Sequence, residues 1–359
     1  MTLTRLPGHS PVLDAERFKS EVGGRPVALY TLQNSRGMVV GITNYGAKIE
    51  QILVPDRYGE LADVLLGYDS LQGAVGGSPS MGAFIGRYAG RIANASFSLD
   101  GQRYQLGANN GLHCLHGGIK GSRLRVFDAV QSSPSCVEMQ LVFADGEEGF
   151  PGTLALSVSY SVNEANELVI AYQAMAHDKP AVGNFTTHGF FNLDGHASGS
   201  VLGHEVTIYA SRLVGMTSEL IATGLLLEVT GTPFDFRQAT ALVERMNVQV
   251  AGYDGCYVVD RSAANGALEL CARISAPGSG RVMEVWSTEP ALQFYTGLVA
   301  GEPLAGGPGK EGATYLQQQS FCVEPQGYPN APNLPQFPSS RHVPGVPRSG
   351  QTVYRFSTS

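Results

Sequence analysis

The middle of the chain alternates apolar and polar side chains with a period of two. Residues 137–143 are apolar at all four odd positions, and residues 156–162 alternate four apolar side chains with three serines. A further apolar run, 168–172, follows a turn-type segment. Because successive side chains of a β-strand point to opposite faces, this pattern predicts meander strands with one buried face and one polar face.

Shorter runs rich in β-branched and aromatic residues lie on either side of these strands. They cover residues 27–32, 38–43, 49–53, 97–104, 282–286 and 292–297, and the fourth of them reads as a hairpin turning at Asp100–Gly101. Helical periodicity is almost absent, and only residues 238–246 are expected to form a short helix. The 45 Gly and 20 Pro are spread along the chain, as many turns between short strands require. The chain is therefore expected to be all-β.

Size and charge narrow the class of protein. The chain has 359 residues, 43% of them apolar, which is enough to bury a large core in two domains or in one large all-β domain. Charged residues make up only 15% and the net charge is -7, which argues against a nucleic-acid partner. No run of apolar residues is long enough to predict a membrane-spanning helix.

The cysteines and the first residues suggest a compartment. Five cysteines are scattered without CxxC spacing, so neither a zinc site nor a disulfide framework is predicted. The first nine residues lack the apolar segment of a signal peptide. We expect free thiols in a reducing compartment and a cytoplasmic location.

One carboxylate near the C-terminal end stands in an apolar run. Glu324 lies within the stretch 321–333, where a predicted strand gives way to a segment rich in Pro and Asn. A carboxylate at the end of a buried strand is a candidate catalytic base. The alternative, a salt-bridged or solvent-facing Glu at a strand end, is favoured by this stretch taken alone.

Four further residues, in three segments, are candidates for chemistry. His113 and His116 precede two glycines, but no H-E-x-x-H pattern accompanies them, so a loop histidine held close to a ligand is favoured over a metal ligand. His188 stands among aromatic and small polar residues, where a lone histidine is more often structural. Asp254 stands beside Gly255, where a turn residue is the simpler interpretation.

Two arginines four residues apart lie in a glycine-dense, apolar segment. Arg87 and Arg91 can be surface charges, for instance on one face of a helix. If either is buried among the apolar residues of 82–92, it needs an acceptor, and a sugar hydroxyl or a carboxylate would serve. The glycines of this segment lack the Lys-Ser/Thr ending of a phosphate-binding loop.

Taken together, these motifs resemble the aldose 1-epimerases, also called galactose mutarotases. The resemblance runs from about Asn44 to Phe356, with eight motifs in the order of that family. They are Asn44–Ala47, Gly86–Ile92, Leu115–Gly118, Thr187–Leu193, Gly231–Phe236, Gly252–Asp254, Leu292–Gly297 and Val323–Gln326.

The resemblance implies a fold and an activity. The fold would be a large antiparallel β-sandwich, the galactose mutarotase-like supersandwich, formed as a single domain over 1–359 with residues 1–20 as a polar lead-in. The activity would be interconversion of the α and β anomers of free aldoses such as glucose and galactose. No cofactor and no metal are implied. The expected partner is the small-molecule sugar, without nucleic acid or membrane, and the chain would be a monomer or a homodimer.

The resemblance also implies roles for individual residues. Glu324 matches the general base and His188 the general acid. The residues that match those holding the sugar are Arg91, His116, Asp254 and Gln293, and His116 is sometimes given a share of the acid role.

These residue types suit the reaction. Anomerisation removes the proton of the C1 hydroxyl and protonates the ring oxygen, so that the ring opens to an aldehyde. Rotation about C1–C2 exposes the other carbonyl face before the ring closes again. A carboxylate with a pKa of about 4.3 is ionised at neutral pH, and a histidine with a pKa of about 6.5 can supply a proton.

Departures from the family pattern bear on the substrate. Gly90 stands where Asn is common, Gly255 and Cys256 stand where a His-Asn pair is common, and Gly189 and Pro325 also differ. The catalytic pair is intact, but an altered pocket would suit another sugar, such as a pentose or an oligosaccharide end.

Other functions are weaker alternatives. A non-catalytic or regulatory sugar-binding protein would not need both Glu324 and His188. An epimerase of phosphorylated hexoses needs more basic residues. A glycosidase using Glu324 and Asp254 would leave His188 without a role.

Overall fold

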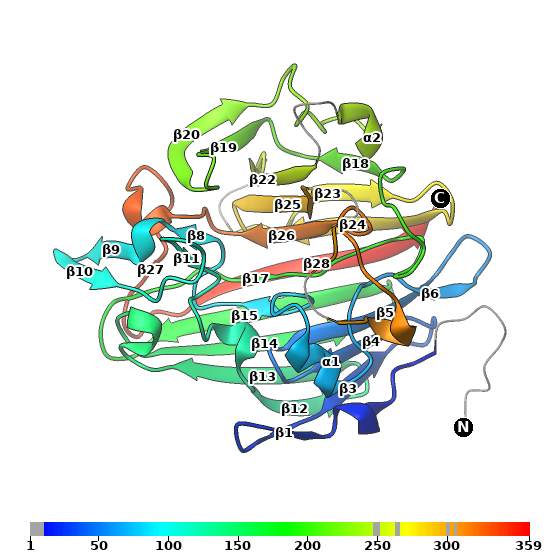
Figure 1. Cartoon of the computed structure of the whole chain (residues 1–359), viewed down its shortest axis with the longest axis horizontal. Helices are drawn as coiled ribbons and strands as arrows, with labels where there is room; N and C mark the ends of the chain where they lie inside the picture. The colour runs from blue at the N-terminus through cyan, green and yellow to red at the C-terminus, as the bar shows by residue number, and fades with distance from the viewer. Residues whose placement is uncertain (1–10, 247–251, 263–265, 299–301, 305–306) are drawn as a thin grey trace.

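Strands dominate the molecule, a computed structural model shown in Figure 1. The structure describes residues 11–246, 252–262, 266–298, 302–304 and 307–359. Among them, three sheets of nine, five and four strands account for most of the regular structure. Neighbouring strands within these sheets are antiparallel, as the alternation of apolar and polar residues predicts for strands with one buried face.

The largest sheet has nine strands, and its middle strand comes from the C-terminal end of the chain. In Figure 1 this strand, β28, runs in red between β15 and β24. The order across the sheet is β12 (Asp128–Ser133), β13 (Cys136–Phe143), β14 (Leu154–Val162), β15 (Glu167–Ala176), β28 (Arg348–Thr358), β24 (Arg281–Ser287), β23 (Glu269–Ser275), β18 (Glu205–Ile208) and β21 (Thr240–Ala241).

Two smaller sheets accompany it. The five-stranded sheet has the order β20 (Ala222–Glu228), β19 (Arg212–Met216), β22 (Tyr253–Val258), β25 (Ala291–Gly297) and β26 (Cys322–Gln326). The four-stranded sheet has the order β3 (Leu29–Gln33), β4 (Val39–Thr43), β5 (Lys48–Pro55) and β6 (Leu61–Asp63).

Short strand pairs and helical turns complete the described chain. The pairs are β1 (Ser20–Val22) with β2 (Arg25–Val27), β9 (Ser96–Leu99) with β10 (Gln102–Gln105), β8 (Arg91–Ile92) with β11 (Cys114–Leu115), β7 (Phe84–Ile85) with β17 (Thr186–Thr187), and β16 (Ala181–Val182) with β27 (Arg341–His342). The α-helices are α1 (Leu71–Gly76) and α2 (Leu242–Arg245). The 3-10 turns are η1 (Ala15–Phe18), η2 (Ala93–Ala95), η3 (Ser122–Leu124), η4 (Glu147–Gly149), η5 (Lys310–Gly312) and η6 (Ala331–Asn333).

The strands predicted from alternation are confirmed. β13, β14 and β15 form the expected meander, and the odd residues of β13 and the even residues of β14 face the core. The hairpin at Asp100–Gly101 is also confirmed, with Leu99 opposite Gln102. Both turn residues have positive φ, 52° and 81°, which favours the Asp-Gly sequence there.

Two local predictions are corrected. The helix expected over 238–246 contracts to the four residues of α2, because Thr240–Ala241 pairs with β18 instead. Within the described part of the polar lead-in Phe18 is fully buried, and the division of residues 1–20 from the domain stays a prediction. Arg87 and Arg91 are not on a helix. Arg87 is buried, and its acceptors are the backbone carbonyls of Val182 and Pro151 rather than a sugar or a carboxylate.

A common apolar core joins the sheets. One cluster of buried side chains includes Ile52 of β5, Val158 of β14 and Phe294 of β25, one from each of the three large sheets. The division into a single domain stays a prediction. Among the described residues, no helix is long and apolar enough to cross a membrane.

Candidate active site

A cleft of about 520 Å³ opens beside the five-stranded sheet. All six residues predicted to act on a sugar line it: Arg91, His116, His188, Asp254, Gln293 and Glu324. They are separated by up to 233 positions in the sequence, from residue 91 to residue 324, so only the folded chain brings them together.

Glu324 is fixed in the strand that forms one edge of the five-stranded sheet. On β26 it stands directly opposite Gln293 of β25, and its side chain is only 3% exposed. The preceding carbonyl, of Val323, accepts a hydrogen bond from the Tyr354 hydroxyl at 3.1 Å. The carboxyl group is therefore held by regular structure rather than by a mobile loop.

His188 is held by its backbone and by stacking. It follows β17, its N–H donates to Ala83 O at 2.9 Å, and its carbonyl accepts from Gly82 N at 2.9 Å. The Phe190 ring stacks on the imidazole with a centroid distance of 4.9 Å and an interplanar angle of 7°. These contacts aim the imidazole at Glu324, with 3.6 Å between His188 Nε2 and Glu324 Oε1.

Burial moves the proton of this pair away from the histidine. Desolvation lowers the pKa of His188 to about 4. Desolvation, with a smaller contribution from the Asp254 charge, raises the pKa of Glu324 well above its usual range. The His188 Nδ1 atom is buried without a hydrogen-bond partner among the described residues, so no acceptor stabilises an imidazolium. Burial therefore shifts both groups toward their neutral forms, whereas the sequence alone predicts an ionised Glu and a protonating His with ordinary pKa values.

His116 is a neutral neighbour of His188. Their ring centroids are 5.5 Å apart in an edge-to-face arrangement. Its Nδ1 accepts a hydrogen bond from Gly90 N at 3.3 Å, which leaves its proton on Nε2. Burial, followed by the His188 and arginine charges, lowers the pKa of His116 well below 6.5. His116 is thus suited to donate a hydrogen bond rather than to act as a cationic acid.

A polar group lies beside the acid–base pair. Gln293 Nε2 donates to Asp254 Oδ1 at 2.5 Å, and Arg91 is oriented by its Nε donating to Asn110 Oδ1 at 2.9 Å. Burial raises the pKa of Asp254, while the Arg91 charge and the Gln293 hydrogen bond oppose that rise. Carboxylate, amide and guanidinium groups together offer both acceptors and donors to sugar hydroxyls.

No strong metal site results from these residues. His188, Cys322 and Glu324 have ligand atoms within 4.8 Å of one another. Burial raises the pKa values of Cys322 and Glu324, and metal ligation would require both groups to lose their protons. The Nδ1 atoms of His113 and His116 accept hydrogen bonds from different backbone groups, Asn94 N and Gly90 N.

Two lining residues escaped the sequence analysis although a signal was present. Gln326 and Tyr295 both line the cleft. Each stands two positions after a predicted site residue on the same strand, Glu324 on β26 and Gln293 on β25, and positions two apart share a strand face. Ser78 and Met216 also line the cleft, and no pattern in the sequence points to them.

Sequence comparison with known proteins points to the same family as the motifs. Residues 28–355 match the family model described as aldose 1-epimerase. The chain is 39% identical over 341 residues to galactose mutarotase from Bos taurus, covering 94% of this chain and 96% of that protein. It is 33% identical over 340 residues to aldose 1-epimerase from Escherichia coli (strain K12), covering 93% of this chain and 96% of that protein.

A solved structure agrees. The GalM/aldose epimerase homologue from C. elegans superposes with a TM-score of 0.85 at 28% identity, covering 92% of this chain and 99% of that chain. The chain belongs to the aldose 1-epimerase family, and the predicted antiparallel, galactose mutarotase-like fold is confirmed.

Proposed function

We propose that Glu324 and His188 are the acid–base pair with which this chain interconverts the anomers of free aldoses. Family membership makes the chain an aldose 1-epimerase, an isomerase, so the proposal concerns the residues that act. The observation that supports it most is the 3.6 Å approach of His188 Nε2 to Glu324 Oε1 within a cleft lined by sugar-compatible polar groups.

The proton count of the pair suits a reversible ring opening. Glu324 takes the proton from O1 of the cyclic sugar, while His188 gives a proton to O5 as the C1–O5 bond breaks. The products are the open-chain aldehyde with a free C5 hydroxyl, a neutral Glu324 and a neutral His188. After rotation about C1–C2 the two protons return, and the opposite anomer leaves.

Burial favours the protonation states of Glu324 and His188 that accompany the open-chain aldehyde. The neutral forms of both groups, toward which the pKa shifts move them, are the forms that accompany the open-chain aldehyde. The ionised form, which must accompany the cyclic sugar, is disfavoured by desolvation. The Glu324 carboxylate and the His188 imidazolium must therefore form before the ring opens. Proton transfer in the transition state relieves their buried charge, so the site binds the transition state more tightly than the ionised reactant complex.

Sugar recognition is assigned to the remaining predicted residues. Asp254 and Gln293 would bind hydroxyls of the ring, and Arg91 and neutral His116 would donate hydrogen bonds to the sugar. At Gly90 a Cβ atom would lie 3.0 Å from Pro329 Cβ, which is tight, so the glycine fits a close approach of the two loops. Asn, which is common there in the family, would require Pro329 to shift, so we infer a locally different sugar contact.

Polarimetry tests the proposal. Fresh α-glucose and α-galactose are mixed with wild type and with Glu324→Gln, which keeps the size of the side chain but removes the base. We expect rapid equilibration by the wild type and a loss of about 10²–10⁴-fold in the variant. Glu228→Gln on the exposed part of β20 makes the same chemical change outside the cleft and is expected to retain full activity.

Two outcomes would change the assignment. Equal rates for Glu324→Gln and wild type would remove Glu324 as the base. If neither protein accelerates either sugar, a panel of pentoses and disaccharides distinguishes an enzyme for another sugar from a sugar-binding protein.

We also propose an oligomeric state and a cellular location. We infer a monomer or homodimer, which light scattering measures directly. The five cysteines form no disulfide, which supports a reducing compartment such as the cytoplasm.

A further inference from the structure

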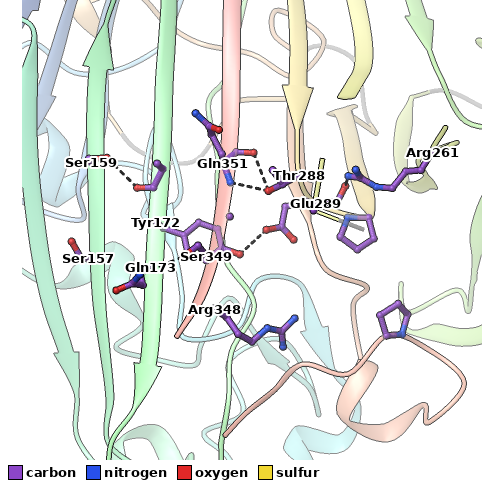
Figure 2. A pocket seen from close by; sticks show the side chains of 15 residues that line it. Ser157, Ser159, Tyr172, Gln173, Arg261, Thr288, Glu289, Arg348, Ser349 and Gln351 are labelled. Carbon is purple, nitrogen blue, oxygen red and sulfur yellow. Dashed lines mark hydrogen bonds between the residues drawn. The ribbon is translucent and has the colours of Figure 1, made fainter. Parts of the chain in front are cut away.

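A second cavity, larger than the cleft, lies where two strands of the nine-stranded sheet diverge. Its volume is about 790 Å³. β28 pairs with β15 from Arg348 to Arg355, but it pairs with β24 only from Thr352 onward. The first residues of β28 therefore lack β24 as a neighbour, and the cavity opens at that edge (Figure 2).

Neutral polar side chains form one wall. Ser157, Gln173 and Ser349 stand opposite one another across β14, β15 and β28 and all line the cavity. Thr288 lies beside the first residues of β28, where its Oγ1 accepts a hydrogen bond from Gln351 N at 2.9 Å. Hydroxyl and amide groups on rigid strands can each donate and accept hydrogen bonds.

A carboxyl group stands on the other side of the cavity. Glu289 Oε1 accepts a hydrogen bond from the Tyr172 hydroxyl at 2.6 Å, whereas its Oε2 has no donor among the described residues. Figure 2 shows the two side chains pointing toward one another across β28. They can meet only because residue 350 is glycine: a Cβ there would lie 2.4 Å from both Glu289 Oε1 and Tyr172 Cε1.

Two arginines border the carboxyl group but do not neutralise it by contact. Arg261 holds the main chain, donating to the carbonyls of Ser287 and Glu289. Arg348 donates through Nη1 to Ser339 O at 2.8 Å and to Arg341 O at 3.2 Å. Within the described chain its other N–H groups have no acceptor, so Arg348 and Glu289 both keep capacity for a ligand.

The geometry points to a second binding site, for a neutral saccharide, formed by Glu289, Arg348 and the Ser157–Gln173–Ser349 row. Neighbouring sugar hydroxyls can donate to a carboxylate and accept from a guanidinium at once, while the serine and glutamine groups match the remaining hydroxyls. Arg261 also lines the cavity, but its guanidinium donates to main-chain carbonyls and lies 4.0 Å from Glu269 Oε2. The charged groups that keep capacity for a ligand are therefore one carboxylate and one guanidinium, which favours a ligand without strong net charge. The site shares no residue with the catalytic cleft and does not depend on the reaction proposed there.

Methyl-labelled NMR can follow the two sites separately. Thr288 lines the second cavity and Met216 lines the cleft, so threonine and methionine methyl signals report on each. The probes are methyl α-D-glucopyranoside, methyl α-D-galactopyranoside and maltotriose, and the two glycosides cannot open their rings. We expect at least one probe to shift the Thr288 signal saturably.

Three variants test the location. Ser157→Phe fills the cavity from the exposed face of β14 and should abolish the Thr288 shift. Ser161→Phe makes the same change on the same face of β14 outside the cavity and should leave it intact. Glu289→Gln should weaken binding about tenfold or more, because hydrogen bonds to charged groups are the stronger ones. Mutarotation of glucose is expected to stay unchanged in all three.

Several results would overturn the assignment. These are no Thr288 shift with any probe up to its solubility, or the same shift in Ser157→Phe as in Ser161→Phe. Inorganic phosphate that shifts Thr288, and binds more tightly to Glu289→Gln than to wild type, would define an anion site instead. Because Met216 and the mutarotation assay report on the cleft, failure of one proposal leaves the other measurable.

Discussion

Two buried acid–base pairs in this molecule are built in opposite ways. Lys310 and Asp63 are 2% and 1% exposed, and Lys310 Nζ lies 2.6 Å from Asp63 Oδ2. The same ammonium donates to the carbonyls of Glu50 at 2.6 Å and Leu65 at 2.7 Å, so all three of its protons are used. His188 and Glu324 are similarly buried, yet they stand 3.6 Å apart.

The difference lies in the remaining hydrogen bonds. Asp63 also accepts from Ile52 N and Gln51 Nε2, whereas His188 Nδ1 has no partner among the described residues. A saturated pair has no capacity left for a ligand and holds β5, β6 and η5 together. An unsaturated pair is costly to bury without a function, since each unpaired polar group loses its hydration. Hydrogen-bond saturation therefore separates the structural pair from the candidate catalytic pair.

The largest expected effect concerns the histidine. His188→Asn removes the proton donor to O5, and we expect kcat for glucose mutarotation to fall about 10²–10⁴-fold. The free energy of unfolding should change little, because the imidazole gives up few hydrogen bonds. Polarimetry and urea denaturation measure the two quantities. If the variant unfolds readily but remains fully active when folded, His188 is a structural residue. The His188–Glu324 pair would then not differ in role from the Lys310–Asp63 pair.

The structural pair should respond in the reverse manner. Lys310→Met leaves Asp63 buried without its cation, and we expect a loss of about 3–5 kcal/mol in the free energy of unfolding, measured in urea. The folded variant should retain its mutarotation rate. The matched control is Lys179→Met, whose partner Asp145 lies at 2.8 Å with both side chains more than 40% exposed, and it should cost no more than about 1 kcal/mol. A catalytic defect in folded Lys310→Met would show that the two pairs are coupled.

The smallest expected effect is a pH profile without an acid limb across the weakly acidic range. Between the lowered pKa of His188, about 4, and the raised pKa of Glu324, the pair holds one proton and has both an acid and a base. Below about pH 4 a second proton removes the base, and above the pKa of Glu324 the last proton is lost. We expect kcat/KM not to fall as the pH drops from 7 to 5, measured by polarimetry with the buffer rate subtracted. An acid limb near pH 6.5 would mean that burial does not depress the histidine.

The sheets were predictable where side chains face two different environments. β13 and β14 could be assigned because every second residue enters the core. The helix over 238–246 was overestimated because a local pattern cannot anticipate that Thr240 pairs with Val206 of β18. Long-range pairing overrides weak local propensity in such segments.

The candidate site was predictable as a set of residue types but not as an electrostatic environment. Family motifs nominated Glu324 and His188, yet their pKa shifts come from burial, which no single motif encodes. The second cavity could not be predicted from the sequence for a related reason. Ser157 and Ser159 fit an ordinary solvent-facing side of a strand, and only the folded chain adds Glu289 and Arg348 from distant segments.

The position of β28 has a consequence for how the protein is made. β28 alone joins β15 to β24, and it follows every other strand of the nine-stranded sheet in the sequence. While the chain is being synthesised, both halves of that sheet must wait with an unpaired edge until residues 348–358 emerge. Closure then joins segments more than 170 positions apart, as in Ala174 opposite Arg348. Such long-range pairing is slow and exposes strand edges to other chains, so production in cells is expected to depend on temperature and on chaperones more than native stability alone would suggest.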